Sequence, residues 1–380
     1  MMLTPTLQAK LDAFDGNLPL SAARTIPNSW YHDSEIAQLE RENVFGRSWQ
    51  YVGRGAQVAA PGSFLTTSIA GEPVLVVRDR DGQLRAFANV CRHRAARIVT
   101  EAVGTAKGFQ CPYHGWVYDL NGKLKGAPEF DGVDDFDRRD CRLPEYHVST
   151  LGPFVFVHLR EPTETVEAAF APLIARGHID HFTGLHFAAR REFDLTCNWK
   201  VFADNYLDGG YHVKSIHPQL AGVIDYSKYH TINEGNAALQ VSPLKPSADG
   251  TAINSVRKGD AAYYWWAYPN LMMNIYEGTA DINVVLPVAP DRCKVIFEYY
   301  FSDIEGPAAQ TFIAESIRVA DKVQDEDVGI CEDVQRGLSS SSYATGRYSV
   351  RREAGGYHFH QLLARALRTS HSSPTNFSGH

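Results

Sequence analysis

Two short loops, each with one cysteine and one histidine, constrain this chain more than any other feature. The pairs are Cys91 with His93 and Cys111 with His114, and together they read Cys-x-His-x17-Cys-x2-His. Two thiolates and two neutral imidazoles in this arrangement suit a two-iron, two-sulfur cluster in which one iron takes nitrogen ligands. Such a cluster carries one electron at a time, so the sequence predicts a protein that transfers electrons.

A structural zinc ion is the alternative, because two cysteines and two histidines are a common zinc set. Zinc fingers, however, usually place cysteine with cysteine and histidine with histidine, whereas each loop here supplies one of each. The flanking residues favour iron and sulfur, because Cys91–Arg94 and Cys111–Trp116 resemble the two cluster loops of Rieske oxygenases.

Composition bounds the class of protein. At 380 residues, with 44% hydrophobic and 21% charged residues, the chain is globular and long enough for two domains. A net charge of −7 argues against a nucleic-acid partner, and no apolar run approaches the roughly 20 residues that a membrane span needs. The other four cysteines are scattered singly and no export signal is visible, so we expect a cytoplasmic protein.

Local patterns divide the chain into three predicted parts. Residues 1–45 form a helical segment, since apolar residues recur at helical spacing in Ser34–Phe45. Residues 46–160 carry short β-rich runs and turn signals such as Asn121-Gly122, which predict a small antiparallel β domain with the cluster loops at hairpin tips. Residues 161–380 mix helical and strand patterns and predict an α+β domain with an antiparallel sheet.

His212 and His217 predict a second metal site. Their spacing of five puts the side chains about 140° apart on a straight helix, so both cannot reach one metal from an unbroken helix. Pro218 disfavours helical geometry at His217, so we expect the helix to end between the two histidines. Such a pair is usually structural. The predicted cluster favours the metal interpretation here, because a cluster domain alone needs only roughly 100 residues and the long remainder of the chain requires another role.

Asn205, Asp208 and His212 share one stripe if residues 198–212 form a continuous helix. Gly209-Gly210 weakens that helix by on the order of 1 kcal/mol per glycine, so a break or a π-bulge is expected there.

A carboxylate would complete a 2-His-1-carboxylate iron site. Asp327 is favoured over Asp325, because it lies at the edge of the apolar stripe of a long helix predicted over residues 307–338.

Several further stretches support a wider likeness: Asn28-Ser29-Trp30-Tyr31, Ser48-Trp49-Gln50-Tyr51-Val52-Gly53, Asn89-Val90-Cys91, Asn198-Trp199-Lys200 and Tyr268-Pro269-Asn270. With them the chain resembles, over nearly its whole length, the α subunit of a Rieske non-haem iron ring-hydroxylating oxygenase of the choline-monooxygenase-like branch. The resemblance implies a Rieske [2Fe-2S] domain and a helix-grip-like catalytic domain with a mononuclear Fe(II). It also implies that the N-terminal helical segment packs with the catalytic domain.

The resemblance assigns roles to the residues above. The cluster ligands would be Cys91, His93, Cys111 and His114, and the iron ligands His212, His217 and Asp327. Asp208, with Asn205 beside it, would join an iron-ligating histidine to a cluster-ligating histidine across a subunit boundary. The family commonly has two residues between that acid and the first histidine, whereas this chain has three. A π-bulge would absorb the extra residue; otherwise Asp204 or Asn205 becomes the bridge.

Partners also follow from the resemblance. A separate NAD(P)H-dependent reductase of flavin or ferredoxin type would supply electrons. They would pass through His93 or His114 and Asp208 to the iron of a neighbouring chain, which predicts a ring-shaped homo-oligomer, most simply a trimer. O2 and a small organic molecule would be the substrates.

The aromatic run Tyr263–Tyr268 bears on the substrate, because strand alternation puts Tyr264 and Trp266 on one face. Core packing is the simpler interpretation; the functional one is a pocket wall, with Tyr276 added. Such a wall suits a quaternary ammonium group through cation–π attraction, but it suits a flat aromatic equally well. The resemblance favours hydroxylation or N-demethylation of an ammonium or amine compound. Aromatic-ring hydroxylation is the alternative, and an electron carrier or redox sensor without mononuclear iron is a remote third.

Overall fold

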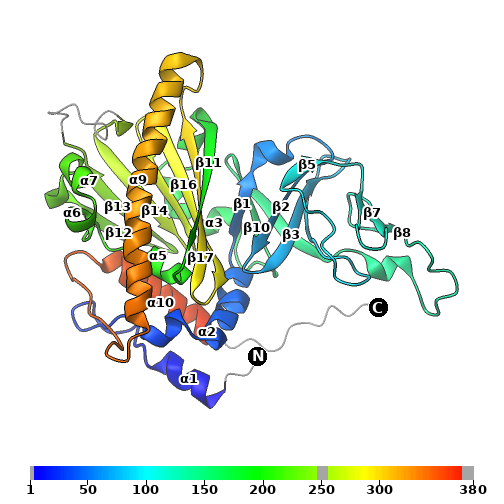
Figure 1. Ribbon diagram of the computed structural model, residues 1–380, viewed down its shortest axis with the longest axis horizontal. Helices are drawn as coiled ribbons and strands as arrows, with labels where there is room; N and C mark the ends of the chain where they lie inside the picture. Colours follow the sequence, from blue (N-terminus) through cyan, green and yellow to red (C-terminus); the bar gives the residue numbers. More distant parts are fainter. Residues whose placement is uncertain (1–3, 246–255, 370–380) are drawn as a thin grey trace. The chain divides into compact units, whose positions relative to one another are not determined.

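The computed structural model describes residues 4–245 and 256–369. These residues form two compact units (Figure 1). The first comprises Phe45–Val166, and the second comprises residues 4–44 together with the described residues from Glu167 onward.

The first unit is built from antiparallel strands, as predicted. Its larger sheet has the order β1-β10-β9-β4-β3-β2-β5, and a smaller one has the order β6-β7-β8. Gly122, with φ of +75°, makes the turn between β7 and β8, which confirms the Asn121-Gly122 hairpin. The strand bounds are β1 (Gln50–Arg54), β2 (Ser63–Ile69), β3 (Glu72–Arg78), β4 (Leu84–Ala88), β5 (Val103–Thr105), β6 (Phe109–Gln110), β7 (Val117–Tyr118), β8 (Leu124–Gly126), β9 (Glu145–Leu151) and β10 (Phe154–His158).

The hydrophobic core of this unit lies directly beneath the cysteine–histidine loops. Phe64, Phe87 and Trp116 pack in one buried cluster with Cys91 and Cys111. Because the two thiols are part of the core, the loops that carry them are held in place by the same packing that holds the sheet.

The second unit is an α+β structure with one seven-stranded antiparallel sheet, in the order β11-β17-β16-β15-β14-β13-β12. Its strands are β11 (His186–Leu195), β12 (His230–Glu234), β13 (Ala237–Pro243), β14 (Ala261–Ala267), β15 (Leu271–Tyr276), β16 (Thr279–Ala289) and β17 (Arg292–Phe301). Its helices are α1 (Pro5–Asp12), α2 (Ser34–Leu39), α3 (Val166–Ala169), α4 (Ala171–Ala175), α5 (Trp199–Tyr206), α6 (Val213–Ile216), α7 (Pro218–Val223), α9 (Gly306–Leu338) and α10 (Ala354–Arg368). The long helix α9 packs against α5 and the sheet (Figure 1).

Residues 4–44 are tied to this unit by a buried ion pair. Glu40, 2% exposed, accepts from Lys200 Nζ at 2.6 Å and from Trp199 Nε1 at 2.8 Å. Glu40 begins a π-helical turn, Glu40–Val44, that follows α2. Trp199 and Lys200 open α5, so this pair fixes the start of the helix that leads to the predicted iron ligands.

The prediction of one helix over residues 198–212 is wrong, although the expected break is confirmed. Helix α5 ends at Tyr206, and Gly209 and Gly210 take the left-handed conformation with φ of +68° and +69°. A Cβ atom at Gly209 would lie 2.1 Å from the Arg352 carbonyl oxygen, so only glycine fits there. The chain therefore turns instead of forming a π-bulge, and Asn205, Asp208 and His212 share no helical stripe.

Within the stretches that the structure describes, every helix is too short or too polar to span a membrane.

Candidate functional site

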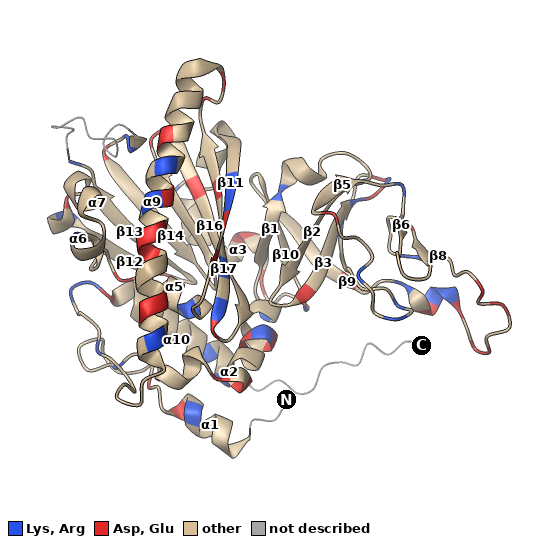
Figure 2. Cartoon of the chain, viewed as in Figure 1, with Lys and Arg blue, Asp and Glu red and all other residues tan. Residues whose placement is uncertain are grey.

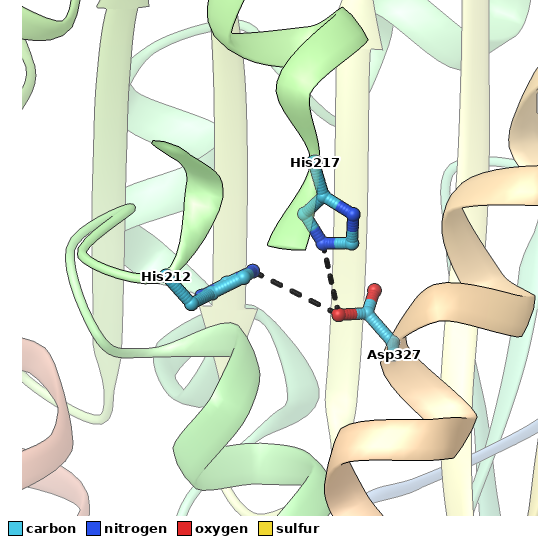
Figure 3. A group of neighbouring side chains, drawn as sticks. All are labelled: His212, His217 and Asp327. Carbon is cyan, nitrogen blue, oxygen red and sulfur yellow. Dashed lines mark hydrogen bonds and ion pairs between the residues drawn. The ribbon is translucent and has the colours of Figure 1, made fainter. Parts of the chain in front are cut away.

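His212, His217 and Asp327 converge on one point (Figure 3). The Nε2 atoms of His217 and His212 lie 3.0 Å and 3.7 Å from Asp327 Oδ1, and the three ligand atoms all lie within 4.8 Å of one another. Two imidazoles and a carboxylate so placed can bind one ion on one side and leave the other side open. The donor set therefore fits mononuclear Fe(II).

Each of these side chains is held by a different local structure. His212 occupies the N-cap position of α6 without a capping side-chain hydrogen bond, and His217 lies between α6 and α7 with φ of −117° and ψ of 68°. This non-helical geometry before Pro218 turns His217 toward His212, as the sequence predicts. Asp327 comes from α9, where acidic and basic residues follow one another (Figure 2); its side chain is only 15% exposed.

A second layer of polar groups holds the three side chains. Asp208 Oδ2 lies 2.6 Å from His212 Nδ1 and also accepts from the His212 backbone N–H. Glu326 Oε2 lies 2.6 Å from His217 Nδ1, and Asn205 Nδ2 donates to Asp327 Oδ1 at 2.7 Å. Each histidine thus has an acid at Nδ1, which leaves Nε2 for a metal.

Negative charge dominates this centre. Burial lowers the pKa of His217, but the hydrogen bonds and charges of Asp327 and Glu326 outweigh it and hold that pKa above its usual value. A field that favours a proton on His217 also favours a divalent cation between the two side chains.

Asp204, the alternative bridge, is directed elsewhere. Its Oδ2 accepts from the Tyr31 hydroxyl at 2.6 Å, and its Oδ1 lies 2.8 Å from His360 Nε2. The structure thus places Asp208, and not Asp204, against His212, with the three intervening residues forming the turn.

The two cysteine–histidine loops share one hydrogen-bond pattern. Cys91 N–H donates to Ala96 O, and Cys111 N–H donates to Trp116 O; in each loop the residue four positions after the cysteine donates back to the cysteine carbonyl. Those fourth residues, Ala95 and Gly115, have φ of +56° and +73°. Two loops with the same conformation thus present their ligands as a matched pair.

The loop side chains fit a cluster. The His93 and His114 rings lie 4.5 Å apart between centroids, and His93 stacks on Trp116. His93 Nδ1 is enclosed without a hydrogen-bond partner, as expected of a metal ligand. Burial and the adjacent Cys91 thiol raise the pKa of Cys111. A bound metal would offset the negative charge of two thiolates at this place.

A cavity of about 120 Å³ lies beside the His212–His217–Asp327 centre and is partly lined by it. This volume is several times the roughly 10–15 Å³ that one water molecule needs. Tyr264 and Tyr276 line the cavity, with Tyr229 stacked 6.3 Å from Tyr264. The expectation for Trp266 is wrong: it is fully buried, packs on Phe359 and donates to the Pro269 carbonyl.

The cavity wall also carries two charged side chains that sequence reasoning missed. Enclosure raises the pKa of Asp281 to about 7, and Asn274 Nδ2 donates to its Oδ2 at 2.8 Å. The Arg257 guanidinium carbon lies 5.4 Å from the centroid of the Tyr276 ring. Asp281 lies inside a strand pattern that gives no signal of function, and Arg257 precedes the aromatic strand in an irregular stretch.

Known proteins match both units. Residues 48–137 match the Rieske [2Fe-2S] domain, and residues 182–369 match the ring-hydroxylating α subunit catalytic domain. Chloroplastic choline monooxygenase of Arabidopsis thaliana is 38% identical over 93% of this chain and 86% of its own length. The carnitine monooxygenase oxygenase subunit of Escherichia coli K12 is 32% identical over 91% of this chain and 94% of its own.

Among solved structures, a quaternary ammonium Rieske monooxygenase has a TM-score of 0.82 and 29% identity, over 94% of this chain and 98% of that one. The work on that structure concerns carnitine oxidation and inter-subunit electron transfer.

Both domain matches, and relatives covered over most of their length, thus agree with the fold of the two units. The protein is an oxidoreductase that carries a Rieske [2Fe-2S] cluster and a mononuclear iron and works with a separate reductase and a small-molecule substrate. The chain belongs to the Rieske non-haem iron oxygenases, as a ring-hydroxylating α subunit of the choline-monooxygenase-like branch.

Proposed function

We propose that this oxygenase hydroxylates or N-demethylates a small quaternary ammonium or amine compound. The observation that carries the proposal is the cavity beside His212, His217 and Asp327, whose wall combines tyrosine rings with the carboxylate of Asp281. Tyrosine faces attract a cation by about 0.5–2 kcal/mol each, and Asp281 adds a negative charge when it is ionised. The named activities of the choline and carnitine relatives support the same substrate class.

In this proposal the residues of the second unit hold the substrate against the centre. When bound, the iron supplies activation of O2 and the cluster supplies single electrons. Asp208 and Glu326 keep the Nδ1 protons on His212 and His217, and Asn205 holds the orientation of Asp327. The tyrosine wall forms the face that receives the substrate. In a monooxygenation, one oxygen atom enters the substrate and the other leaves as water, which consumes two electrons and two protons.

We also propose that Asp208 receives electrons from a neighbouring copy of the chain. Asp208, Asp204 and Glu353 line one recess of about 310 Å³ on the catalytic unit. In the cluster unit, His114 is exposed, and so are the nearby Arg92 and Arg94. An acidic recess and a basic loop are complementary, which favours docking of one copy on another.

The finer features of the assembly are proposals as well. A docking of this head-to-tail kind closes into a ring, most simply a homotrimer. The electron donor would be an NAD(P)H-dependent reductase of flavin or ferredoxin type. The four cysteines outside the cluster loops form no disulfide, which fits a reducing setting such as the cytoplasm.

A single-turnover experiment tests the substrate class without the natural reductase. The iron-loaded chain is reduced with dithionite, freed of excess reductant and exposed to ¹⁸O2 with one candidate compound. We expect a trimethylammonium compound to give a hydroxylated product, or formaldehyde and the demethylated amine, detected by mass spectrometry.

Its uncharged tert-butyl isostere is the matched control and should give little product. Efficient oxidation of naphthalene, with no product from any ammonium or amine compound, would favour aromatic-ring hydroxylation and overturn the proposal.

A further inference from the structure

Two enclosed hydrogen-bond donors without a partner lie in the wall of the cavity. They are Arg257 Nη1 and Gln324 Nε2. Gln324 is 2% exposed and precedes Asp327 by one turn of α9. An enclosed donor left unpaired destabilises a protein, and a charged one does so more. Two such donors in one cavity therefore indicate that an acceptor on the ligand completes their hydrogen bonding.

The positive charge of Arg257 favours a negatively charged acceptor. In the described part of the chain, Arg257 forms no ion pair within 4.0 Å, and the charge of Asp281 acts on it without a hydrogen bond. Its nearest recorded partner is the face of Tyr276, whose hydroxyl donates to the Tyr264 hydroxyl at 3.1 Å. The guanidinium thus stands beside the same tyrosines that the proposed function assigns to an ammonium group, and a purely cationic substrate would meet a like charge there.

Apart from the His212–His217–Asp327 centre, the lining of the cavity has one basic side chain, Arg257, and one acidic side chain, Asp281. Asp281 is anchored by Asn274, which in turn accepts from the Tyr206 hydroxyl at 2.8 Å. A wall with one guanidinium, one carboxylate and tyrosine faces is complementary to a ligand that has both an ammonium and a carboxylate.

We propose that the substrate is a betaine, that is, a fully N-methylated amino acid, whose carboxylate binds Arg257 and Gln324. Its ammonium group then lies against the tyrosine faces and Asp281. This inference rests on the proposed function and adds the carboxylate to it. Arg257 and Gln324 are accordingly the specificity-determining residues that distinguish a betaine from an amino alcohol such as choline.

Four compounds of nearly one shape test the inference. Glycine betaine and choline share the trimethylammonium group, and 3,3-dimethylbutanoate and 3,3-dimethylbutan-1-ol replace it with tert-butyl. Binding to the iron-loaded enzyme is measured by anaerobic calorimetry. We expect glycine betaine to bind roughly tenfold or more tightly than choline, because a charged hydrogen bond is worth that much.

Variants locate the effect. Arg257→Gln should weaken glycine betaine roughly tenfold or more and leave choline unchanged or improved, whereas Arg257→Lys should lose less. Gln324→Met should weaken glycine betaine selectively as well. Lys258→Gln is the matched control: Lys258 is the exposed neighbour, and its loss of charge should change neither compound.

The two possible failures are distinguishable. If choline binds as tightly as glycine betaine, and Arg257→Gln affects both alike, the carboxylate site is overturned while the proposed function stands. If each tert-butyl compound binds as tightly as its ammonium counterpart, the ammonium has no role, and the proposed function and the betaine inference both fail.

Discussion

At the scale of single residues, the centre depends on carboxylates that do not themselves bind the ion. Asp208 and Glu326 each accept the Nδ1 proton of one histidine. Such outer partners fix which ring nitrogen is free for a metal, and their loss typically costs about 10–100-fold in affinity or activity. The two acids should nevertheless differ in what they control, because only Asp208 also lines the acidic recess.

Asp208→Asn should leave the iron content near that of the wild type and slow turnover about 10–100-fold, because the variant keeps the size of the side chain but loses the charge toward His212. Iron analysis, the cluster absorption spectrum and steady-state rates check this. Asp204→Asn is the comparison, since Asp204 accepts a hydrogen bond from Tyr31 and faces His360 instead. Normal turnover in Asp208→Asn, or a larger loss of turnover in Asp204→Asn, would contradict the assignment of Asp208 as the bridge.

Glu326→Gln should weaken binding of the mononuclear iron about 10–100-fold, because His217 loses the charge that favours a proton on Nδ1 and a metal at Nε2. Competition with a chelator, followed by iron analysis, measures the affinity. Asp325→Asn removes the charge of the exposed neighbouring residue and is the matched control. Equal iron loss from both variants would mean that general charge on α9, and not the contact to His217, retains the metal.

At the scale of elements, the sequence predicts positions that depend on local periodicity and misses those that depend on distant contacts. Asp327 could be chosen because α9 is regular over its whole length. The role of Glu326 could not, because its partner His217 lies on another element. The prediction of a continuous helix was wrong at Leu207–Tyr211, because the turn at Gly209 packs closely on the Arg352 backbone, which is far away in the sequence.

Trp266 shows the same limit in a strand. Strand alternation predicts that Trp266 shares a sheet face with Tyr264. Of the two, only Tyr264 lines the cavity. Which part of a sheet face borders a cavity is decided by the helices above it, and α10 covers Trp266 through Phe359. Strand periodicity therefore predicts a face but not what lies over that face.

The turn between α5 and α6 gives a prediction at this scale. Gly209→Ala should lower the free energy of unfolding by about 1–3 kcal/mol, because alanine is strained at φ of +68° and its Cβ would meet the Arg352 carbonyl. The same shift should displace His212 and reduce iron content. Chemical denaturation and iron analysis check both effects.

Gly329→Ala serves as its control, because Gly329 lies inside α9 with open space around its Cβ position. There alanine should raise the free energy of unfolding by about 0.5–1 kcal/mol. If both variants behaved alike, the left-handed turn would not be what positions His212.

At the scale of the whole molecule, the two metal centres belong to separate compact units, each with its own core and its own ligands. Loss of one centre should therefore leave the other loaded. The wild type should hold about three irons per chain, two in the cluster and one at the mononuclear site.

Cys91→Ser should reduce the iron content to about one per chain and abolish the cluster spectrum, and His217→Ala should leave about two with that spectrum intact. Cys141→Ser is the control, since Cys141 packs against the cluster core without lying in either loop, and it should keep all three irons. Iron analysis, with absorption and electron paramagnetic resonance spectra of the reduced protein, separates the cases. Complete iron loss from Cys91→Ser would show that the units depend on each other for metal binding. Two irons in the wild type, unchanged in His217→Ala, would instead mean that the chain is an electron carrier and that the second centre holds no iron.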